Sequence, residues 1–552
     1  MNSNSPIHGR RLTRSTLLAL AVLAAASASC SSSSTSGTTQ PPADAGGPQP
    51  SNVKGPQDAA PPRDGGQIVM GLEGEPEGLD PTRFAFAASG HYIASAVFEP
   101  LATIDAGGQA VPYLATAIQP NADFTTWTIT LPEGVKFHDN TTLDSAVVKA
   151  NLDAHRSSMI TRLAMLTVAD VQAPDATHVT VALTKPWVRF PNLLTSQIGY
   201  VLAPAMLADP ELSKKPIGTG PFVFDSHVDF QSWTFKKNPN YHHAGLPHVG
   251  SMLFKIIVDE GERQRALEAG DVDVIHSAKP DQVLALKASG AYKIVNYSGG
   301  EEDFLTVNTL KPPFDSLTAR RAVAYATDSA GWLRDRTKNV EQASNSPYAP
   351  GQLGYEKDNG YPAFDMNKAK ELAAQYQTET GQQLSFSLAT TEGLDNQADA
   401  QYFIKAYEQA GMKVTALTYK QIQLVAQTAT GNFEMALFRN FGFHDPDTDA
   451  TFFRSASALD LGGLSLNFPH YRDPAVDEAL DKALAAPTDA ERDQAYRSLQ
   501  RIFAEKLPYL WLGRPEWVLA ANPRVNGIYP AANGTIQTLG AKTWLSEMWV
   551  SQ

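Results

Sequence analysis

The stretch that decides the fold is WTITLPEGVKFHDNTTLDSAVVKANLDAH, residues 127–155. Its first part alternates apolar and polar residues on both sides of a Pro-Glu-Gly turn, which predicts a β-hairpin over Trp127–Phe137. Two other segments read as strands, GGQIVMGLEG at 65–74 and THVTVALTK at 177–185. The first of these is the first strand of the globular part of the chain.

Helical patterns are interleaved with these strands. The segment 262–275 reads as a short helix ended by Gly270 and followed by a strand, and helical spacing recurs at 316–328 and 366–377. Residues 474–506 read as two helices broken at Pro487, with Thr488 and Glu491 as a capping box on the second. Helices and strands alternate throughout, which predicts an α/β protein with more than one lobe.

Length and charge exclude some classes of function. The 552 residues can form several domains or one large multi-lobed unit, and 43% hydrophobic with 19% charged residues is ordinary globular composition. The 45 basic and 58 acidic residues give a net charge of −13. Nucleic acid is therefore excluded as the main partner, because phosphate binding needs basic patches.

The N-terminus has the features of an export signal. A basic start, an apolar run over 17–26 and small residues lead to Cys30, the only cysteine, so no intrachain disulfide can form. Small residues before a lone cysteine resemble a bacterial lipobox, although Ser27 stands where that pattern usually has Leu. We expect 1–30 to be a lipoprotein signal peptide with lipidation at Cys30. One alternative is ordinary signal-peptide cleavage, in which Cys30 has no role. The other is a twin-arginine signal at Arg10-Arg11.

Residues 31–65 consist mainly of Ser, Thr, Pro, Gly, Ala and Asp. Such a segment cannot bury enough apolar surface to offset its ordering entropy, so it is predicted to be a flexible tether. The tether and anchor together would hold the globular part at the outer face of the cell membrane, on the periplasmic or cell-envelope side. The lipid anchor is then the only expected contact with the membrane.

Five blocks in order resemble one known family. They are VFEPLATIDAGGQAVPYLATAI (97–118), the opening stretch, PIGTGPFVF with KKNPNYHHAGLPHVGSMLFKII (216–257), FLTVNTLKPPFDSLTARRAVAYATD (304–328) and the segment from NFPHYRDPAVDEALDKAL to AEKLPYLWL (467–512). Each block alone is weak evidence for a family, but the five blocks in this order are specific to one. The chain resembles the family 5 extracellular solute-binding proteins, the dipeptide/oligopeptide-binding group that serves ABC importers.

The resemblance implies the fold and its divisions. It predicts an α/β periplasmic-binding-protein-like fold of the class II or cluster C type, with two lobes around a ligand cleft, a hinge and an extra subdomain. The family domain would cover 66–522, and 523–552 would be a C-terminal part of lobe I. The approximate divisions are lobe I at 66–100, 200–300 and 510–552, the extra subdomain at 101–199 and lobe II at 301–509.

The resemblance also implies the walls of the cleft. One wall would be Phe84–Ser89 (FAFAAS), whose small residues let a ligand backbone come close, although a packed loop is an equal alternative. The other would lie in 436–453, where the family's amine-binding Asp has no clear counterpart and Asp445 is the nearest candidate. Without that Asp, the cargo could be a capped peptide, a glycan or another small polar compound. The predicted ligand-binding residues are Phe84, Phe86, Ala87, Ala88, Ser89, Asn440, Phe441, Gly442, Phe443, His444 and Asp445.

Other chemistries are disfavoured by the sequence. Asp445, Asp447 and Asp449 have the spacing of a calcium loop, but its glycine and its twelfth-position acid are missing. The pairs His242-His243 and His138-Asp139 lack zinc-site spacing and are interpreted as surface histidines. No nucleophile elbow, P-loop or HExxH motif is present. We therefore expect no metal, no cofactor and no catalytic residue.

The expected function is capture of a peptide or related small polar solute in the cleft, with delivery to an ABC permease and its ATPase complex. Domain closure around the solute would expel water and strengthen each polar contact. The protein is expected to act as a monomer. The alternatives are an envelope-anchored sensory or cell-wall factor with the same fold, and a glycan-acting hydrolase.

Overall fold

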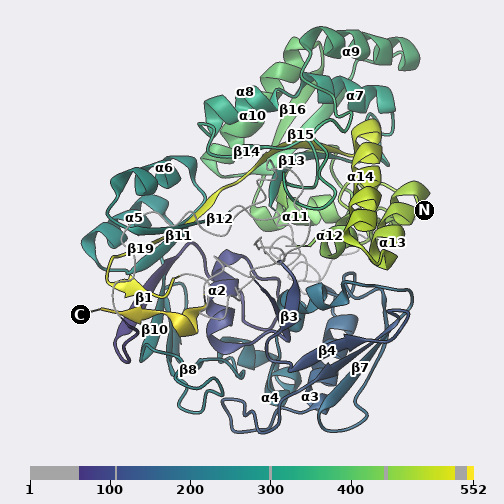
Figure 1. Cartoon of the computed structure of the whole chain (residues 1–552). Coiled ribbons are helices and arrows are strands. Elements are labelled where there is room, and N and C mark those ends of the chain that lie inside the picture. The colour runs from purple at the N-terminus through teal and green to yellow at the C-terminus, as the bar shows by residue number, and fades with distance from the viewer. Residues whose placement is uncertain (1–60, 106–107, 298–300, 441–444, 529–543, 552) are drawn as a thin grey trace, which may run out of the picture.

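The computed structural model describes residues 61–105, 108–297, 301–440, 445–528 and 544–551. Within them the chain builds two large sheets and a four-stranded sheet, which lie in three different regions of the molecule (Figure 1). Each of the three sheets has a hydrophobic core of its own. The predicted α/β architecture of two lobes and an extra subdomain is confirmed.

The first large sheet, which we call lobe I together with the helices packed on it, has β1 at its centre. Its order is β12 (Lys293–Tyr297), β19 (Trp517–Ala521), β11 (Val274–Ser277), β1 (Gln67–Leu72), β10 (Ser251–Ile256), β9 (Ser232–Lys237) and β8 (Phe222–Val228). β1 runs parallel to both of its neighbours. Ile68 and Met70 pack in the core that holds helix α2 (Ala88–Val97), whereas Val69 packs on the opposite core, beneath α5 (Glu260–Ala269) and α6 (Pro280–Ser289). A central strand covered on both faces needs such an apolar run.

The second large sheet forms lobe II with its helices. Its order is β14 (Gln342–Ala343), β18 (Tyr509–Arg514), β13 (Glu302–Val307), β17 (Met435–Asn440), β15 (Ser385–Thr391) and β16 (Lys413–Tyr419). Its helices are α7 (Leu317–Ala326), α8 (Ser329–Arg336), α9 (Met366–Thr380), α10 (Leu394–Gln409), α11 (Gln421–Ala429), α12 (Pro446–Phe453), α13 (Pro474–Ala485) and α14 (Asp489–Lys506).

The chain passes between the two lobes twice. It leaves the first sheet after β12 and enters the second at β13, and it returns between β18 and β19. Figure 1 shows the returning segment as the long yellow strand that joins the two lobes. The return lies at 514–517, because β18 still pairs with β13 in lobe II. Two crossings of this kind form a hinge between the lobes.

The extra subdomain is a four-stranded sheet of order β4 (Ala117–Pro120), β5 (Thr126–Thr130), β7 (His178–Leu183) and β6 (Val168–Gln172), with α3 (Ser145–Ser157). The strand at the start of the opening stretch exists, but the predicted hairpin is wrong. β5 pairs with β4 on one edge and β7 on the other, so no edge is left for the segment after the turn. That segment instead forms a single bridge, between Lys136 and Thr142.

The remaining elements are short. Two small sheets pair β2 (Ala102–Ile104) with β3 (Ala110–Pro112) and β20 (Val525–Asn526) with β21 (Trp549–Val550), and α4 covers Pro204–Ala208. The described part of the chain contains no helix with the length and apolar character needed to cross a bilayer.

Helix ends follow the local chemistry of the sequence. α5 ends at Gly270 in the left-handed region, with φ of 79°, where glycine carries no steric cost. Thr488 and Glu491 form the predicted capping box of α14. These two predictions are confirmed, as are the separate helices on either side of Pro487.

Candidate functional site

A cavity of about 530 Å³ lies between lobe I and lobe II. From lobe I it is lined by Glu73 directly after β1, by the beginnings of α5 and α6 and by Trp517 of β19. From lobe II it is lined by α8, by the ends of β15 and β17 and by the beginnings of α10 and α11. Ligand sites of open α/β sheets lie at the carboxyl ends of parallel strands, which is where Glu73, Thr390 and Thr391 stand.

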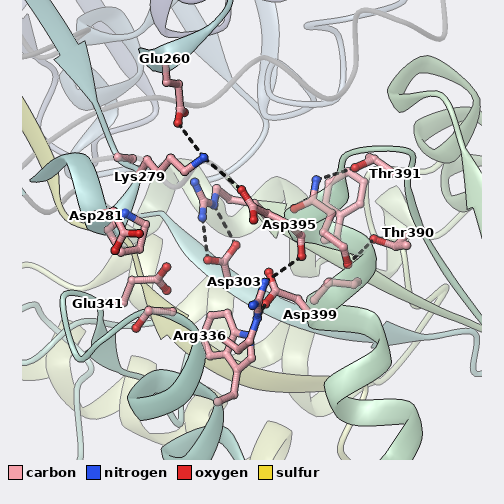
Figure 2. A pocket seen from close by; sticks show the side chains of 18 of the residues that line it. Glu260, Lys279, Asp281, Asp303, Arg336, Glu341, Thr390, Thr391, Asp395 and Asp399 are labelled. Carbon is pink, nitrogen blue, oxygen red and sulfur yellow. Dashed lines mark hydrogen bonds and ion pairs between the residues drawn. The ribbon is translucent and has the colours of Figure 1, made fainter. Parts of the chain in front are cut away.

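The lining of this cavity is acidic. Among the described residues, eight carboxyl side chains and four cationic ones (Lys279, Arg336, Lys338 and Arg439) line it. The carboxyl groups are those of Glu73, Glu260, Asp281, Asp303, Asp335, Glu341, Asp395 and Asp399. Figure 2 shows several of them converging around Lys279 and Arg336. The excess of negative charge favours a ligand that carries a cation.

The cationic groups are already held by carboxylates of the protein. Both nitrogens of the Arg439 fork lie 2.8 Å from the two oxygens of Asp303, its partner on the adjacent strand β13. Arg336 donates to Asp399 at 2.6 Å. The Arg439–Asp303 pair is bidentate, and pairs of that kind are strong and geometrically fixed. These arginines are therefore not free to receive an anionic ligand group.

Two lysines join the lobes across the cavity. Nζ of Lys279, at the start of α6 in lobe I, lies 3.4 Å from Glu260 of its own lobe and 3.3 Å from Asp395 of lobe II (Figure 2). Lys338, after α8 in lobe II, pairs with Asp281 of lobe I. Both pairs connect lobe I to lobe II across the cavity.

Two carboxyl groups of the lining form no direct ion pair among the described residues. Among the residues that the structure describes, none forms a hydrogen bond or ion pair with the Glu73 side chain, and Oε2 of buried Glu341 has no hydrogen-bond partner. Burial raises the pKa of Glu73, although the positive charge of Arg263 opposes the rise. Burial and the negative charge of Asp303 raise the pKa of Glu341. A ligand cation beside either carboxyl group would restore its charged form.

The residues of the predicted first wall pack in lobe I. Phe86 is buried in the core beside α2, and Ala88 and Ser89 begin that helix and are buried as well, whereas Ala87 is exposed. The side chain of Gln197 binds the carbonyl of half-buried Phe84 at 3.1 Å and the N–H of Phe86 at 3.2 Å. Residues 84–89 do not line the described cavity.

The predicted second wall is only partly described. Asn440 ends β17, and Phe441, Gly442, Phe443 and His444 lie outside the described residues. Asp445 caps α12 by accepting from the N–H of Asp447 at 2.9 Å, and it accepts from Arg492 at 2.7 Å. The structure thus places this carboxylate in an internal ion pair.

Asp447 completes a buried network with these groups. It accepts from Arg492 at 2.8 Å, from the indole of Trp187 at 2.9 Å and from the hydroxyl of Tyr496. Trp187 belongs to the extra subdomain, so this network also joins the subdomain to lobe II. The three aspartates of the Asp-x-Asp-x-Asp pattern begin a helix instead of forming an ion-binding loop.

Glu73, Asp303, Glu341 and Arg439 were not among the predicted site residues. A positional rule could have found Glu73 and Arg439, because Glu73 lies near the end of the strand predicted at 65–74 and Arg439 lies within the segment 436–453 that was predicted to hold the second wall. Asp303 and Glu341 reach the cavity only through the pairing of β13 and β14 with distant strands. No short-range pattern in the sequence marks them.

The comparison with protein families matches this architecture. Residues 109–460 match the model of the bacterial extracellular solute-binding proteins, family 5. The chain belongs to this family. Its members are the substrate-binding components of ABC importers and work in the extracellular or periplasmic space.

Curated relatives are similar over most of their length. A di/tripeptide-binding protein of Pseudomonas aeruginosa is 26% identical over 83% of this chain and 92% of its own. A glutathione-binding protein of Pectobacterium atrosepticum is 24% identical over 79% of this chain and 86% of its own. A nickel-binding periplasmic protein of Escherichia coli is also 24% identical, over 79% of this chain and 87% of its own.

Solved structures share the fold. The periplasmic binding protein AgaA of A. tumefaciens, in complex with agropinic acid, has a TM-score of 0.78 at 24% identity over 88% of this chain and 99% of its own. The ABC transporter-associated protein DppA of Helicobacter pylori, in complex with the peptide STSA, has a TM-score of 0.77 at 21% identity over 89% of this chain and 99% of its own. The periplasmic-binding-protein fold is thereby confirmed.

Proposed function

We propose that this solute-binding protein captures a short peptide or a related amine-bearing solute in the cavity between its lobes and delivers it to an ABC permease. The observation that carries the proposal is that Glu73 from lobe I and Glu341 from lobe II line the cavity and form no direct ion pair among the described residues. An ammonium between them would bind both lobes at once. Relatives named for di/tripeptides and for glutathione support a peptide-like solute.

Closure of the lobes would make the charge of the solute important for its affinity. Once lobes close, water leaves, and a charge left without a partner costs several kcal/mol, roughly 2–5 for a buried pair with one partner removed. The solute's ammonium would therefore contribute to closure as well as to affinity. Closure in turn presents the form that the permease recognises.

Binding without turnover is part of the same proposal. The test is mass spectrometry of solute released from the denatured protein, followed by thermal unfolding of the solute-free protein with the identified compound. We expect a compound with a free amino group, recovered chemically unchanged, that raises the unfolding temperature. A solute without any amine or other cation would contradict the proposal, and its conversion into another compound would show an enzyme.

We also propose the anchoring that the N-terminal sequence predicts. Residues 1–30 would be removed with lipidation of Cys30, and residues 31–65 would act as a tether at the outer face of the membrane. The proposed divisions follow the sheets, with lobe I around the first, lobe II around the second and residues 101–199 as the extra subdomain. The proposed active form is a monomer.

The predicted ligand-binding residues 84–89 and 440–445 remain a second candidate wall. The segment 436–440 reaches the cavity through Leu437, Phe438 and Arg439, which supports a contribution from the residues that follow. The buried roles of Phe86 and Asp445 favour the Glu73 and Glu341 pair as the centre that recognises the solute.

A further inference from the structure

A cluster in lobe I, outside the cavity, brings together three side chains that can bind a metal ion. Glu99 follows α2, and His242 and His243 follow the Asn-Pro-Asn-Tyr turn after β9. One ligand atom of each, a carboxylate oxygen and two ring nitrogens, lie within 4.8 Å of one another. The two histidines are half-exposed, as surface histidines can be, and they also share Glu99 as a neighbour.

The separations fit tetrahedral coordination. Nε2 of His242 lies 2.9 Å from Oε2 and 3.1 Å from Oε1 of Glu99, and Nε2 of His243 lies 3.3 Å from Oε1. Zinc binds histidine nitrogen and carboxylate oxygen at about 2.0–2.2 Å, so tetrahedral ligands stand roughly 3.3–3.5 Å apart. Shifts of a few tenths of an ångström would admit an ion between these three atoms.

The carboxylate of Glu99 is held rigidly by other groups. It is 1% exposed, and it accepts from the hydroxyl of Thr219 at 2.7 Å and from that of Tyr241 at 2.9 Å. Such outer partners orient a metal ligand and keep it in place.

The ring nitrogen of His243 is the least satisfied member of the cluster. Its Nε2 is buried and faces the carboxylate without hydrogen-bond alignment. The side chains of His242 and His243 are 21% and 35% exposed, so an ion and a water ligand can reach the cluster from solvent. A buried, unaligned nitrogen beside a charged carboxylate and a second imidazole is what a metal ion would satisfy.

We propose that Glu99, His242 and His243 bind one divalent transition-metal ion, with zinc as the expected ion and water as its fourth ligand. Two imidazoles and one carboxylate with an open position form a common zinc ligand set. The ion would clip the 238–243 turn to the end of α2. None of the three residues lines the cavity between the lobes, so the site is independent of solute capture.

A second cluster in lobe I serves as a comparison. Glu75, His227 and Asp229 also converge, but they offer one imidazole only, and Asp229 is 73% exposed and 3.7 Å from the ring. His227 already donates to or accepts from Glu75 at 2.8 Å. We expect no comparable zinc affinity there.

The test is titration calorimetry of the full chain, stripped with a chelator, with Zn²⁺. We expect one ion bound through this site, with the affinity lowered at least about tenfold by His242→Ala and by His243→Ala, since each removes a ligand. His178→Ala, in an exposed His–Asp pair, and His227→Ala are matched controls that should leave the affinity unchanged. Co²⁺ should give the visible spectrum of a tetrahedral site with the parent but not with His243→Ala.

Equal zinc affinity in the parent and both histidine variants, or no binding by the parent, would overturn the proposal. Folding of the variants is checked by thermal unfolding without metal. If His243→Ala unfolds early, His243→Asn keeps a polar side chain of similar reach and answers the same question. Zinc should raise the unfolding temperature of the parent but not of either His243 variant.

Discussion

Buried charges in this protein divide into those that the fold neutralises and those that it leaves for a ligand. Asp445 and Asp447 share the guanidinium of Arg492, which is 2% exposed. Glu73 and Glu341 form no direct ion pair among the described residues, although Glu341 is buried and Glu73 half-buried. Asp445 and Asp447 therefore stabilise the fold, whereas we assign Glu73 and Glu341 to the ligand site.

Removing Arg492 should destabilise the protein strongly. Arg492→Leu leaves two buried aspartates without their cation, and breaking a buried pair in this way costs about 3–5 kcal/mol. Urea unfolding followed by circular dichroism measures the loss. Arg501→Leu is the matched control on the same helix, because its partner Glu356 forms an exposed pair with it that contributes about 1 kcal/mol or less. Equal losses for the two variants would contradict the account of the network.

Residue-level prediction from sequence succeeded where the chemistry is local. The capping box at Thr488 and the glycine stop at Gly270 depend on neighbours a few residues away. Asp445 was only the nearest candidate for an amine-binding residue, and its partner Arg492 lies 47 positions further along the chain. No short-range sequence pattern predicts an ion pair between residues so far apart. Asp303 and Glu341 could not be predicted for the same reason, because they reach the cavity through strands that are distant in sequence.

At the scale of elements, the two crossings between the lobes contact each other through a buried carboxyl group. Glu301, between β12 and β13, accepts from the indole of Trp517 at the start of β19 at 2.7 Å. Burial raises its pKa to about 8, despite the opposing effects of Arg439 and the indole. An acid whose pKa is higher in the folded than in the unfolded state binds more protons when folded, so stability falls as pH rises from about 4.5 to 8.

Glu301→Gln should remove that part of the pH dependence. Glutamine keeps the hydrogen-bond acceptor but cannot ionise, so the variant should gain stability relative to the parent at pH 8 and gain none at pH 4. The change expected at pH 8 is on the order of a few kcal/mol. Thermal unfolding at several pH values measures it. A constant difference between the two proteins across this range would show that Glu301 does not titrate on unfolding.

The lysines that join the lobes should stabilise the closed form modestly. Lys279 and Lys338 form partly exposed pairs across the cavity, each worth about 0.2–1 kcal/mol. The double variant Lys279→Ala/Lys338→Ala should release solute roughly two- to tenfold faster in stopped-flow measurements, with little change in unfolding temperature. Lys368→Ala, in an exposed pair on α9, is the control. Unchanged release, or a large drop in unfolding temperature, would contradict this role.

Element prediction was accurate for isolated periodic segments and failed at pairing. The strand at 177–185 and the helices at 316–328, 366–377 and 474–506 are present. The hairpin at Trp127–Phe137 is not, because β5 finds both of its partners far away in sequence. Alternation of apolar and polar residues indicates that a segment is extended and half-buried, but it does not predict which strand pairs with it.

For the whole molecule, the N-terminal region is predicted to act only as an anchor. Cys30→Ala should move the protein from the membrane fraction to the soluble envelope fraction or the medium. A chain that begins at Asp64 should still unfold in one cooperative transition, because residues 31–65 have almost no large apolar side chain to bury. Cell fractionation tests the location of Cys30→Ala, and calorimetry tests the unfolding of the shortened chain. Continued membrane association of the variant without lipid would show that another segment holds it.

The central claim is that a ligand amine binds between Glu73 and Glu341, and a two-by-two titration tests it most directly. One peptide, with its amino group free or acetylated, is titrated by calorimetry into the parent and into Glu73→Gln. Asp335→Asn, which lines the same cavity but pairs with exposed Arg334, is the matched control. The parent should prefer the free amine by tens to thousands of fold, equivalent to about 2–5 kcal/mol.

Glu73→Gln should lose most of that preference, and the acetylated peptide should bind both proteins alike. Glu341→Gln repeats the test from lobe II. Asp335→Asn should keep the preference of the parent. A preference for the free amine that survives unchanged in both glutamine variants would place the recognition of the amine elsewhere and contradict the account.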